Sequence, residues 1–166
     1  MAGMGFPLDM RMAYCATYFI CGSPNDTSAG AEPYRKADVA KAKKMLADAG
    51  YKGEKVVLMV PSDVPYLNAE ALMAAQTMKS IGLNVDAQTM DWASIGARRA
   101  KRDAGDAGGW NMYVTVAGEF DANSPIANAY LGAACGNTLP GWPCDKPLDE
   151  LRTAWLKETV PAKRKE

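Results

Sequence analysis

The sequence predicts an α/β fold with an open, mainly parallel sheet and helices on both faces. Strand-like and helical segments alternate along the chain, which is typical of right-handed parallel crossovers. The run Val56–Val60 is apolar without a break, which indicates a strand covered on both faces in the middle of a sheet. Gly50 and Gly82 stand where two of the helical patterns end, as helix-terminating glycines do.

Residues 1–37 contain clusters of Gly, Pro, Ser and Asn with little periodicity, so we expect an irregular lead-in segment. The first regular element is a helix that Asp38 is expected to cap, because apolar residues recur at helical spacing from there up to Gly50. The central strand is predicted over 54–60, followed by a turn at Pro61–Pro65 and a long helix at about Asn68–Ile81.

Residues 83–89 alternate between apolar and polar side chains, which predicts a strand with one wetter face at an edge of the sheet. Asp91 is expected to cap a helix that runs to about Arg102. The glycine-rich stretch 103–109 is interpreted as a flexible connection, and 110–116 as the third strand.

Two further helices are predicted near the end of the chain. The first is expected over 124–131. The second begins at Asp145–Pro147 and carries Leu148, Leu151 and Trp155 on one face. We therefore divide the chain into a lead-in segment, 1–37, and one α/β lobe, 38–166.

Composition excludes several functions. The 166 residues suit one domain, and the 19 basic and 19 acidic residues cancel, so no net field attracts nucleic acid. No stretch approaches the ~20 apolar residues of a membrane span. Histidine is absent, which removes the usual general base and most catalytic zinc sites. We predict no catalytic residues, no metal and no cofactor.

The four cysteines form two local pairs. Cys15 and Cys21 are separated by five residues, and Cys135 and Cys144 by eight. These spacings do not fit the close pairs of zinc sites. Two local disulfides fit better than free thiols and indicate an oxidising compartment, although four cysteines allow three pairings.

The ends of the chain do not resemble natural ends. The first residues lack the basic and apolar regions of a signal peptide. Thr159 and Pro161 begin a helix that stops almost at once. We therefore expect a longer gene product, with its signal peptide outside this chain.

The chain lacks phosphate-loop and nucleophile motifs, so binding is the expected activity. In open parallel sheets, ligands bind beyond the carboxyl ends of the strands, which here are 61–66, 90–92 and 117–125. Asp121 could accept hydrogen bonds from a ligand ammonium group, and Glu119 lies beside it. Trp92 and Trp142 are candidate apolar walls of the site, with core packing as the alternative.

Several stretches, in order, resemble the family 5 extracellular solute-binding proteins, the peptide- and nickel-binding class of ABC importers. They are DVAKAKKMLADAGY at 38–51, the strand 56–61, AEAL at 69–72, IGLNV at 81–85, QTMDW at 88–92, and the strand 110–116 with Asp121 and Pro125 beyond it. The resemblance covers about Pro24–Glu166.

The resemblance implies much of the C-terminal lobe of a two-lobed periplasmic protein with the type II periplasmic-binding-protein fold. The implied partners are a small peptide or peptide-like solute, a membrane permease and the missing N-terminal lobe. Asp121 falls where peptide-binding members pair an aspartate with the peptide's α-amino group, and Cys135–Cys144 resembles a disulfide of dipeptide-type members. Val116–Phe120 lacks the tryptophan that often precedes that aspartate, which leaves the solute open.

Two alternatives remain at this point. One is a small α/β hydrolase or transferase that uses Asp121 and Glu119, which the absent histidine disfavours. The other is an interaction domain without a small ligand.

Overall fold

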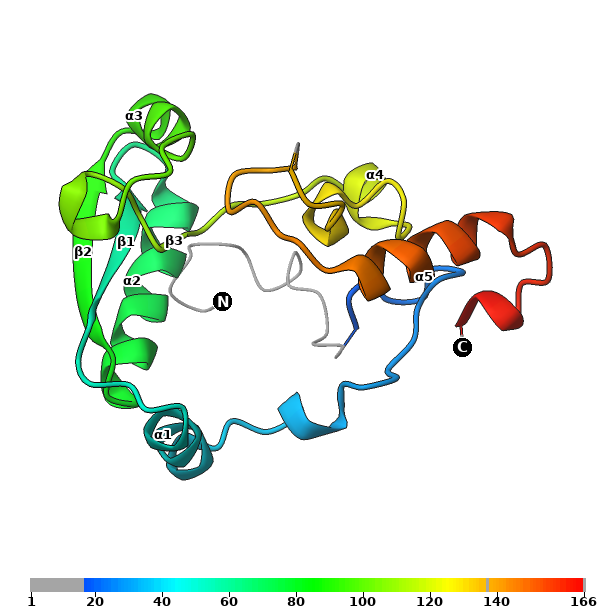
Figure 1. The fold of residues 1–166 in the computed structure, drawn as a ribbon, viewed down its shortest axis with the longest axis horizontal. Helices are drawn as coiled ribbons and strands as arrows, with labels where there is room; N and C mark the ends of the chain where they lie inside the picture. Colours follow the sequence, from blue (N-terminus) through cyan, green and yellow to red (C-terminus); the bar gives the residue numbers. More distant parts are fainter. Residues whose placement is uncertain (1–16, 137, 166) are drawn as a thin grey trace. The chain divides into compact units, whose positions relative to one another are not determined.

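The computed structural model describes residues 17–136 and 138–165, which belong to two compact units (Figure 1). Unit 1 contains Ala37–Thr115, and unit 2 contains the described residues of Tyr14–Lys36 together with those of Val116–Glu166. The unit changes between Lys36 and Ala37, one residue before the end of the predicted lead-in segment, which stays a prediction. The change between 115 and 116 has no counterpart in the sequence-based division, and the single lobe over 38–166 stays a prediction.

Unit 1 is built on a parallel sheet of three strands in the order β2-β1-β3. The strands are β1 (Lys55–Pro61), β2 (Asn84–Met90) and β3 (Met112–Tyr113). Val56 pairs with Val85, and Leu58 pairs with Met112. The predicted parallel sheet, with the most apolar strand in its centre and 83–89 at an edge, is confirmed.

Both faces of β1 are covered. The side chains of Val57, Leu58, Met59 and Val60 are all 0% exposed. Leu58 and Val60 pack in one cluster with three residues of helix α2 (Pro65–Ser80), which are Leu67, Ala71 and Ala75. Because neighbouring strand residues point to opposite faces, Val57 and Met59 belong to the other face.

That second face is approached by a short 3-10 helix, η4 (Gly105–Ala107), and helix α3 (Trp92–Arg98) also contacts β1. A Cβ atom placed on Gly105 would lie 3.0 Å from a methyl carbon of Val57 and 2.9 Å from the side-chain oxygen of Asn111. Only glycine allows so close an approach. The α/β class, with helices on both faces, is confirmed.

Helix α1 (Val39–Asp48) begins at its predicted cap, where the Asp38 side chain accepts a hydrogen bond of 2.8 Å from the backbone N–H of Lys41. No residue of α1 is buried, although Ala42 and Leu46 are half-buried, and Met45 is 60% exposed. Beyond the helix, the Tyr51 hydroxyl donates to the carbonyl of Glu54 and accepts from the N–H of Asn84. Tyr51 thereby joins the starts of β1 and β2.

Three boundaries in unit 1 differ from the prediction. Helix α2 begins at Pro65, one turn earlier than expected, because proline is well suited to the first helical position. Helix α3 ends at Arg98, four residues early, and β3 has two residues instead of seven. The Arg98 guanidinium donates to the Gln88 side chain (2.6 Å) and to the carbonyl of Gly109 (2.6 Å). The stretch expected to be a flexible connection is thus held by specific contacts.

Unit 2 is mostly irregular apart from helix α5 (Lys146–Lys157), which begins at its predicted cap, Asp145. The helix expected over 124–131 is reduced to a 3-10 turn, η5 (Ala129–Leu131). The loop expected around Asp121 forms a short helix, α4 (Glu119–Ala122). The described part of the unit also contains two more 3-10 turns, η3 (Glu32–Tyr34) and η6 (Lys163–Lys165).

A disulfide joins Cys135 to Cys144 in unit 2, as predicted. Beside it, Ala134 forms an isolated antiparallel bridge with Cys144, and the N–H of Asp145 donates to the carbonyl of Ala133 at 3.0 Å. Cys21 is also disulfide-bonded. Its predicted partner, Cys15, lies outside the described residues, so that pairing stays a prediction.

Within the part of the chain that the structure describes, no helix is long and apolar enough to cross a membrane.

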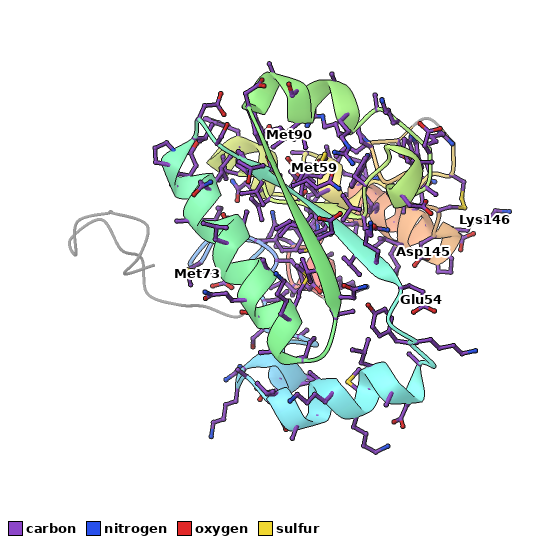
Figure 2. All side chains as sticks on the ribbon, turned by 90° about the vertical axis from the view of Figure 1, so that its left-hand side faces the viewer. Glu54, Met59, Met73, Met90, Asp145 and Lys146 are labelled. Atoms are coloured by element: carbon purple, nitrogen blue, oxygen red, sulfur yellow. A yellow bond between two sulfur atoms is a disulfide. The ribbon has the colours of Figure 1, made fainter. Side chains whose placement is uncertain are left out.

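Two methionines allow a matched test of the central strand. Figure 2 shows Met59 on β1 in the packed interior and Met73 projecting from α2, where it is 48% exposed. Met59→Ala should lower the free energy of unfolding by about 2–5 kcal/mol because it leaves a cavity. Met73→Ala should change it by less than about 0.5 kcal/mol. Urea unfolding followed by circular dichroism measures both; equal losses would contradict the central position of β1.

The disulfide gives a second test. Replacing Cys135 and Cys144 by serine should lower stability by about 2–3 kcal/mol, because the bond closes a short loop in the unfolded chain. Peptide mapping of the non-reduced protein should recover a Cys135–Cys144 link and a Cys15–Cys21 link. Crossed links, or thiols that react with an alkylating reagent in denaturant, would contradict the local pairing.

Candidate functional site

The carboxyl ends of β1 and β2 are bonded to each other in unit 1. The N–H of Ser62 donates to the carbonyl of Met90 at 2.8 Å, and the N–H of Trp92 donates to the Asp63 side chain at 2.8 Å. The side-chain amide of Asn68 donates to the carbonyl of Pro61 at 2.8 Å. Two of the three predicted binding loops, 61–66 and 90–92, therefore form one edge.

Carboxylates bond to the start of helix α3 at this edge. The Asp91 side chain accepts bonds from the Ser94 hydroxyl (2.7 Å) and the Ser94 N–H (2.9 Å). The hydroxyl bond, followed by the backbone bond, lowers the pKa of Asp91 below its ordinary value. Asp63 accepts from the first N–H of the same helix. The helix start is thus occupied by the protein's own carboxylates, which makes it unsuited to an anionic ligand.

The side chain of Trp92 packs against the apolar cluster of unit 1 and is half-buried. The interpretation of this tryptophan as core packing therefore has direct support. Its role as a wall of a binding site stays a prediction.

The other three predicted site residues belong to unit 2. Asp121 lies on α4 with an exposed side chain, and its N–H donates to the carbonyl of Gly118 at 3.1 Å. Glu119 is the first residue of the same helix, and its side chain is outside the described part of the structure. Trp142 is half-buried in the loop closed by the disulfide, with a left-handed backbone (φ 47°). The four residues come from both units, so their grouping in one site stays a prediction.

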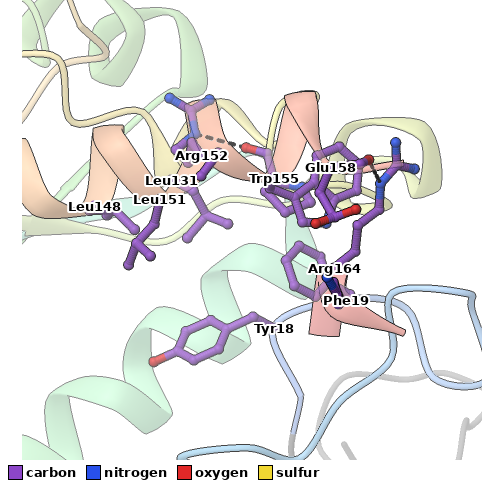
Figure 3. A pocket seen from close by; sticks show the side chains of 12 residues that line it. Tyr18, Phe19, Leu131, Leu148, Leu151, Arg152, Trp155, Glu158 and Arg164 are labelled. Atoms are coloured by element: carbon purple, nitrogen blue, oxygen red, sulfur yellow. Dashed lines mark hydrogen bonds between the residues drawn. The ribbon is translucent and has the colours of Figure 1, made fainter. Parts of the chain in front are cut away.

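Unit 2 contains an apolar pocket of about 610 Å³ that the sequence did not reveal. Leu148 and Leu151 point into it from α5, and Tyr18 lies on its opposite side (Figure 3). Phe19 and Trp155 also line it. We call this cavity the α5 pocket. The predicted stripe on α5 indicated one wall of the pocket, whereas Tyr18 and Phe19 come from a distant segment without periodicity.

Charged side chains border the α5 pocket. The Arg164 guanidinium lies 4.8 Å from the centre of the Trp155 ring, in cation–π geometry, and donates to the carbonyl of Glu158 at 2.7 Å. Arg152 donates to the carbonyl of Pro125 at 2.8 Å and forms an ion pair of 3.5 Å with Asp149. The Arg152 side chain is only 16% exposed, and its hydrogen bonds to the carbonyls of Pro125 and Ile126 connect α5 to the 125–126 turn.

Among the described residues, no group of three or more acidic or cysteine side chains is placed to hold a metal ion.

Comparison with known proteins gives the family. The sequence profile described as "Bacterial extracellular solute-binding proteins, family 5 Middle" matches residues 16–138, well over half of the chain. The chain belongs to this family. The resemblance drawn from the sequence motifs is therefore confirmed.

One relative is a probable peptide ABC transporter periplasmic-binding protein, y4tO, of Sinorhizobium fredii. It is 33% identical to this chain over 120 residues, which are 72% of the chain and 22% of y4tO. The chain thus spans about a fifth of the length of this family 5 relative.

Solved structures agree on the fold. AppA of Clostridium difficile matches with a TM-score of 0.70 at 16% identity, over 91% of this chain and 30% of AppA. AgaA of A. tumefaciens R10, solved in complex with agropinic acid, matches with a TM-score of 0.64 at 24% identity, over 89% of this chain and 30% of AgaA. The chain has the type II periplasmic-binding-protein fold over most of its length.

The lowered pKa of Asp91 makes a prediction about pH. A carboxylate with a lowered pKa stabilises the fold at pH values above its ordinary pKa, and this contribution is lost as the pH falls through the lowered value. Ser94→Ala should raise the pKa of Asp91 toward its ordinary range, as measured by carbon-13 NMR of the carboxyl group. Ser80→Ala is the control, because the Ser80 hydroxyl donates to a backbone carbonyl. An Asp91 titration unchanged by Ser94→Ala would contradict the assigned cause.

Proposed function

We propose that this chain is part of the solute-binding component of an ABC importer, which captures peptide-like solutes in the periplasm and delivers them to an inner-membrane permease. The observation that carries the proposal is the family match over residues 16–138. The name of the 33% identical relative y4tO supports the peptide class and the periplasmic location.

Within that protein, the chain would form one lobe only. It spans 22% of y4tO and 30% of AppA and AgaA, which is consistent with a separate N-terminal lobe outside these residues. In such a protein the solute would be held between two lobes that close about a hinge. About half of its contacts would then come from residues that this chain lacks.

Asp121 is the proposed partner of the solute's ammonium group. Its side chain is exposed and sits on a four-residue helix that follows the third strand in the sequence. Charge-assisted hydrogen bonds to an ammonium are stronger than neutral ones, most of all where closure excludes water. Glu119 would add negative charge beside it, and Trp92 and Trp142 would supply apolar walls.

The alternatives have less support. A hydrolase or transferase that uses Asp121 and Glu119 gains nothing from the family, whose members bind solutes. An interaction domain without a small ligand is also disfavoured by the family match. Turnover assays on a panel of peptides and esters would distinguish a hydrolase or transferase from a binding protein. Calorimetric titration with solutes would distinguish an interaction domain from a binding protein.

The first test compares this chain with an assembled protein, a chimaera in which the chain replaces the corresponding segment of y4tO. By isothermal titration, the chimaera should bind a solute from a panel of di- and oligopeptides that also includes agropinic acid. The isolated chain should bind the same solute far more weakly or not at all, because the opposing contacts are missing. Micromolar or tighter peptide binding by the isolated chain would refute the one-lobe assignment.

The second test concerns Asp121. In the chimaera, Asp121→Asn should weaken binding of a peptide with a free amino terminus by about tenfold or more, the size expected for a lost charge-assisted bond. It should leave the weaker binding of the N-acetylated peptide nearly unchanged. Asp106→Asn, an exposed carboxylate on η4, is the control. Equal losses of affinity for both peptides would show that Asp121 does not bind the ammonium group of the solute.

A further inference from the structure

Unit 2 has almost no interior of its own. Among its residues whose exposure is described, only Ala133 and Asn128 are buried. Helix α5 buries no residue at all, although it carries an apolar stripe. Unit 1, by contrast, buries four consecutive residues of β1 completely. Of the stripe on α5, Leu148 and Trp155 are half-buried and Leu151 is 67% exposed. A helix whose apolar stripe is only partly covered gains less stability from packing, so unit 2 has apolar surface left for a further contact.

Two large exposed apolar side chains of unit 2 line the α5 pocket. Tyr18 is 75% exposed and Leu151 is 67% exposed, and both line this cavity. Leu148, Leu151 and Trp155 follow one another at helical spacing, so the stripe extends about 10 Å along α5 at ~1.5 Å per residue. A surface of this length matches two turns of a helix or a short strand better than a single small molecule.

The rim of the α5 pocket is mainly basic. Its lining residues include Lys163 and Arg164 against one carboxylate, Glu158, and a third cation, Arg152, which is paired with Asp149. A second copy of this chain would place the same basic rim opposite itself, which like-charge repulsion disfavours. An occupant with acidic residues beside its apolar face would complement the rim.

We propose that the α5 pocket is the docking surface for an apolar-faced, acid-flanked polypeptide segment that full-length family 5 proteins carry outside these 166 residues. This inference rests on the proposed function, because it assumes that the chain is part of a longer binding protein. The relative y4tO is long enough to contain such a segment, because the chain matches only 22% of it. Insertion of that segment would give unit 2 the core it lacks.

Two leucines of α5 provide a matched test. Leu151 lines the pocket and is 67% exposed, whereas Leu156 is 59% exposed and is not among the lining residues. In the y4tO chimaera without solute, Leu151→Asp should raise the equilibrium constant of unfolding by at least about tenfold, as a buried charge does. Leu156→Asp should change it by less than about threefold. In the isolated chain both substitutions should have equally small effects.

A dye provides an independent readout on the isolated chain. Anilinonaphthalene sulfonate, an apolar anion, should bind the wild-type chain and Leu156→Asp with enhanced fluorescence, and Leu151→Asp should lose that enhancement. In the chimaera the enhancement should be absent, because the segment fills the pocket. Light scattering should show the isolated chain as a monomer.

Several results would overturn the proposal. Equal effects of the two aspartates in the chimaera would show that nothing covers Leu151, and so would dye binding that persists there. A dimer of the isolated chain that Leu151→Asp dissociates would assign the surface to a second copy. A chimaera that does not fold, although y4tO does, would mean that the complementary segment does not fit. No solute is present in these measurements, so a chimaera that passes them but binds no solute would reject the proposed function alone.

Discussion

The complete burial of β1 is the constraint on which unit 1 depends. Four consecutive side chains, Val57 to Val60, are removed from water, and successive residues of a strand face opposite sides. Each face therefore needs its own cover. Helix α2 supplies one, with small residues such as Ala71 that let it approach the sheet, and η4 supplies the other through Gly105. The parallel order β2-β1-β3 follows, because a strand buried on both faces takes the centre.

Unit 2 is held together by local links instead of a core. The Cys135–Cys144 disulfide closes one loop, Asp145 caps α5, and Arg152 donates to two carbonyls of the 125–126 turn. Each of these interactions fixes a neighbouring segment but removes little apolar surface from water. The difference between the units therefore lies in where their stability originates. Unit 1 draws on its own interior, whereas unit 2 has its main apolar surface still available for a partner.

The sequence predicted best what a single segment determines. The apolar run of β1 and the caps Asp38, Asp91 and Asp145 are local signals, and the structure confirms them. The sequence-based prediction failed where contacts between distant segments determine the structure. Helix α3 ends early because Arg98 donates to the carbonyl of Gly109, and β3 pairs with β1 at only two positions. The α5 pocket was missed for the same reason, since part of its wall comes from the distant residues Tyr18 and Phe19. The grouping of Trp92 with Asp121 stays a prediction because the two belong to different units.

The same asymmetry bears on how solute specificity would arise. Trp92 is fixed at its backbone by Asp63 and at its ring by the apolar cluster, so its position is set before any solute arrives. Asp121 lies on a four-residue helix beside Phe120, which is 93% exposed, and its side chain is exposed as well. A solute bound at Asp121, as proposed, would have to order this short helix on binding, which costs free energy. Under the proposed function, substitutions in 117–125 should change the preferred solute with little loss of stability, whereas substitutions at the β1 and β2 ends should disturb the sheet edge itself.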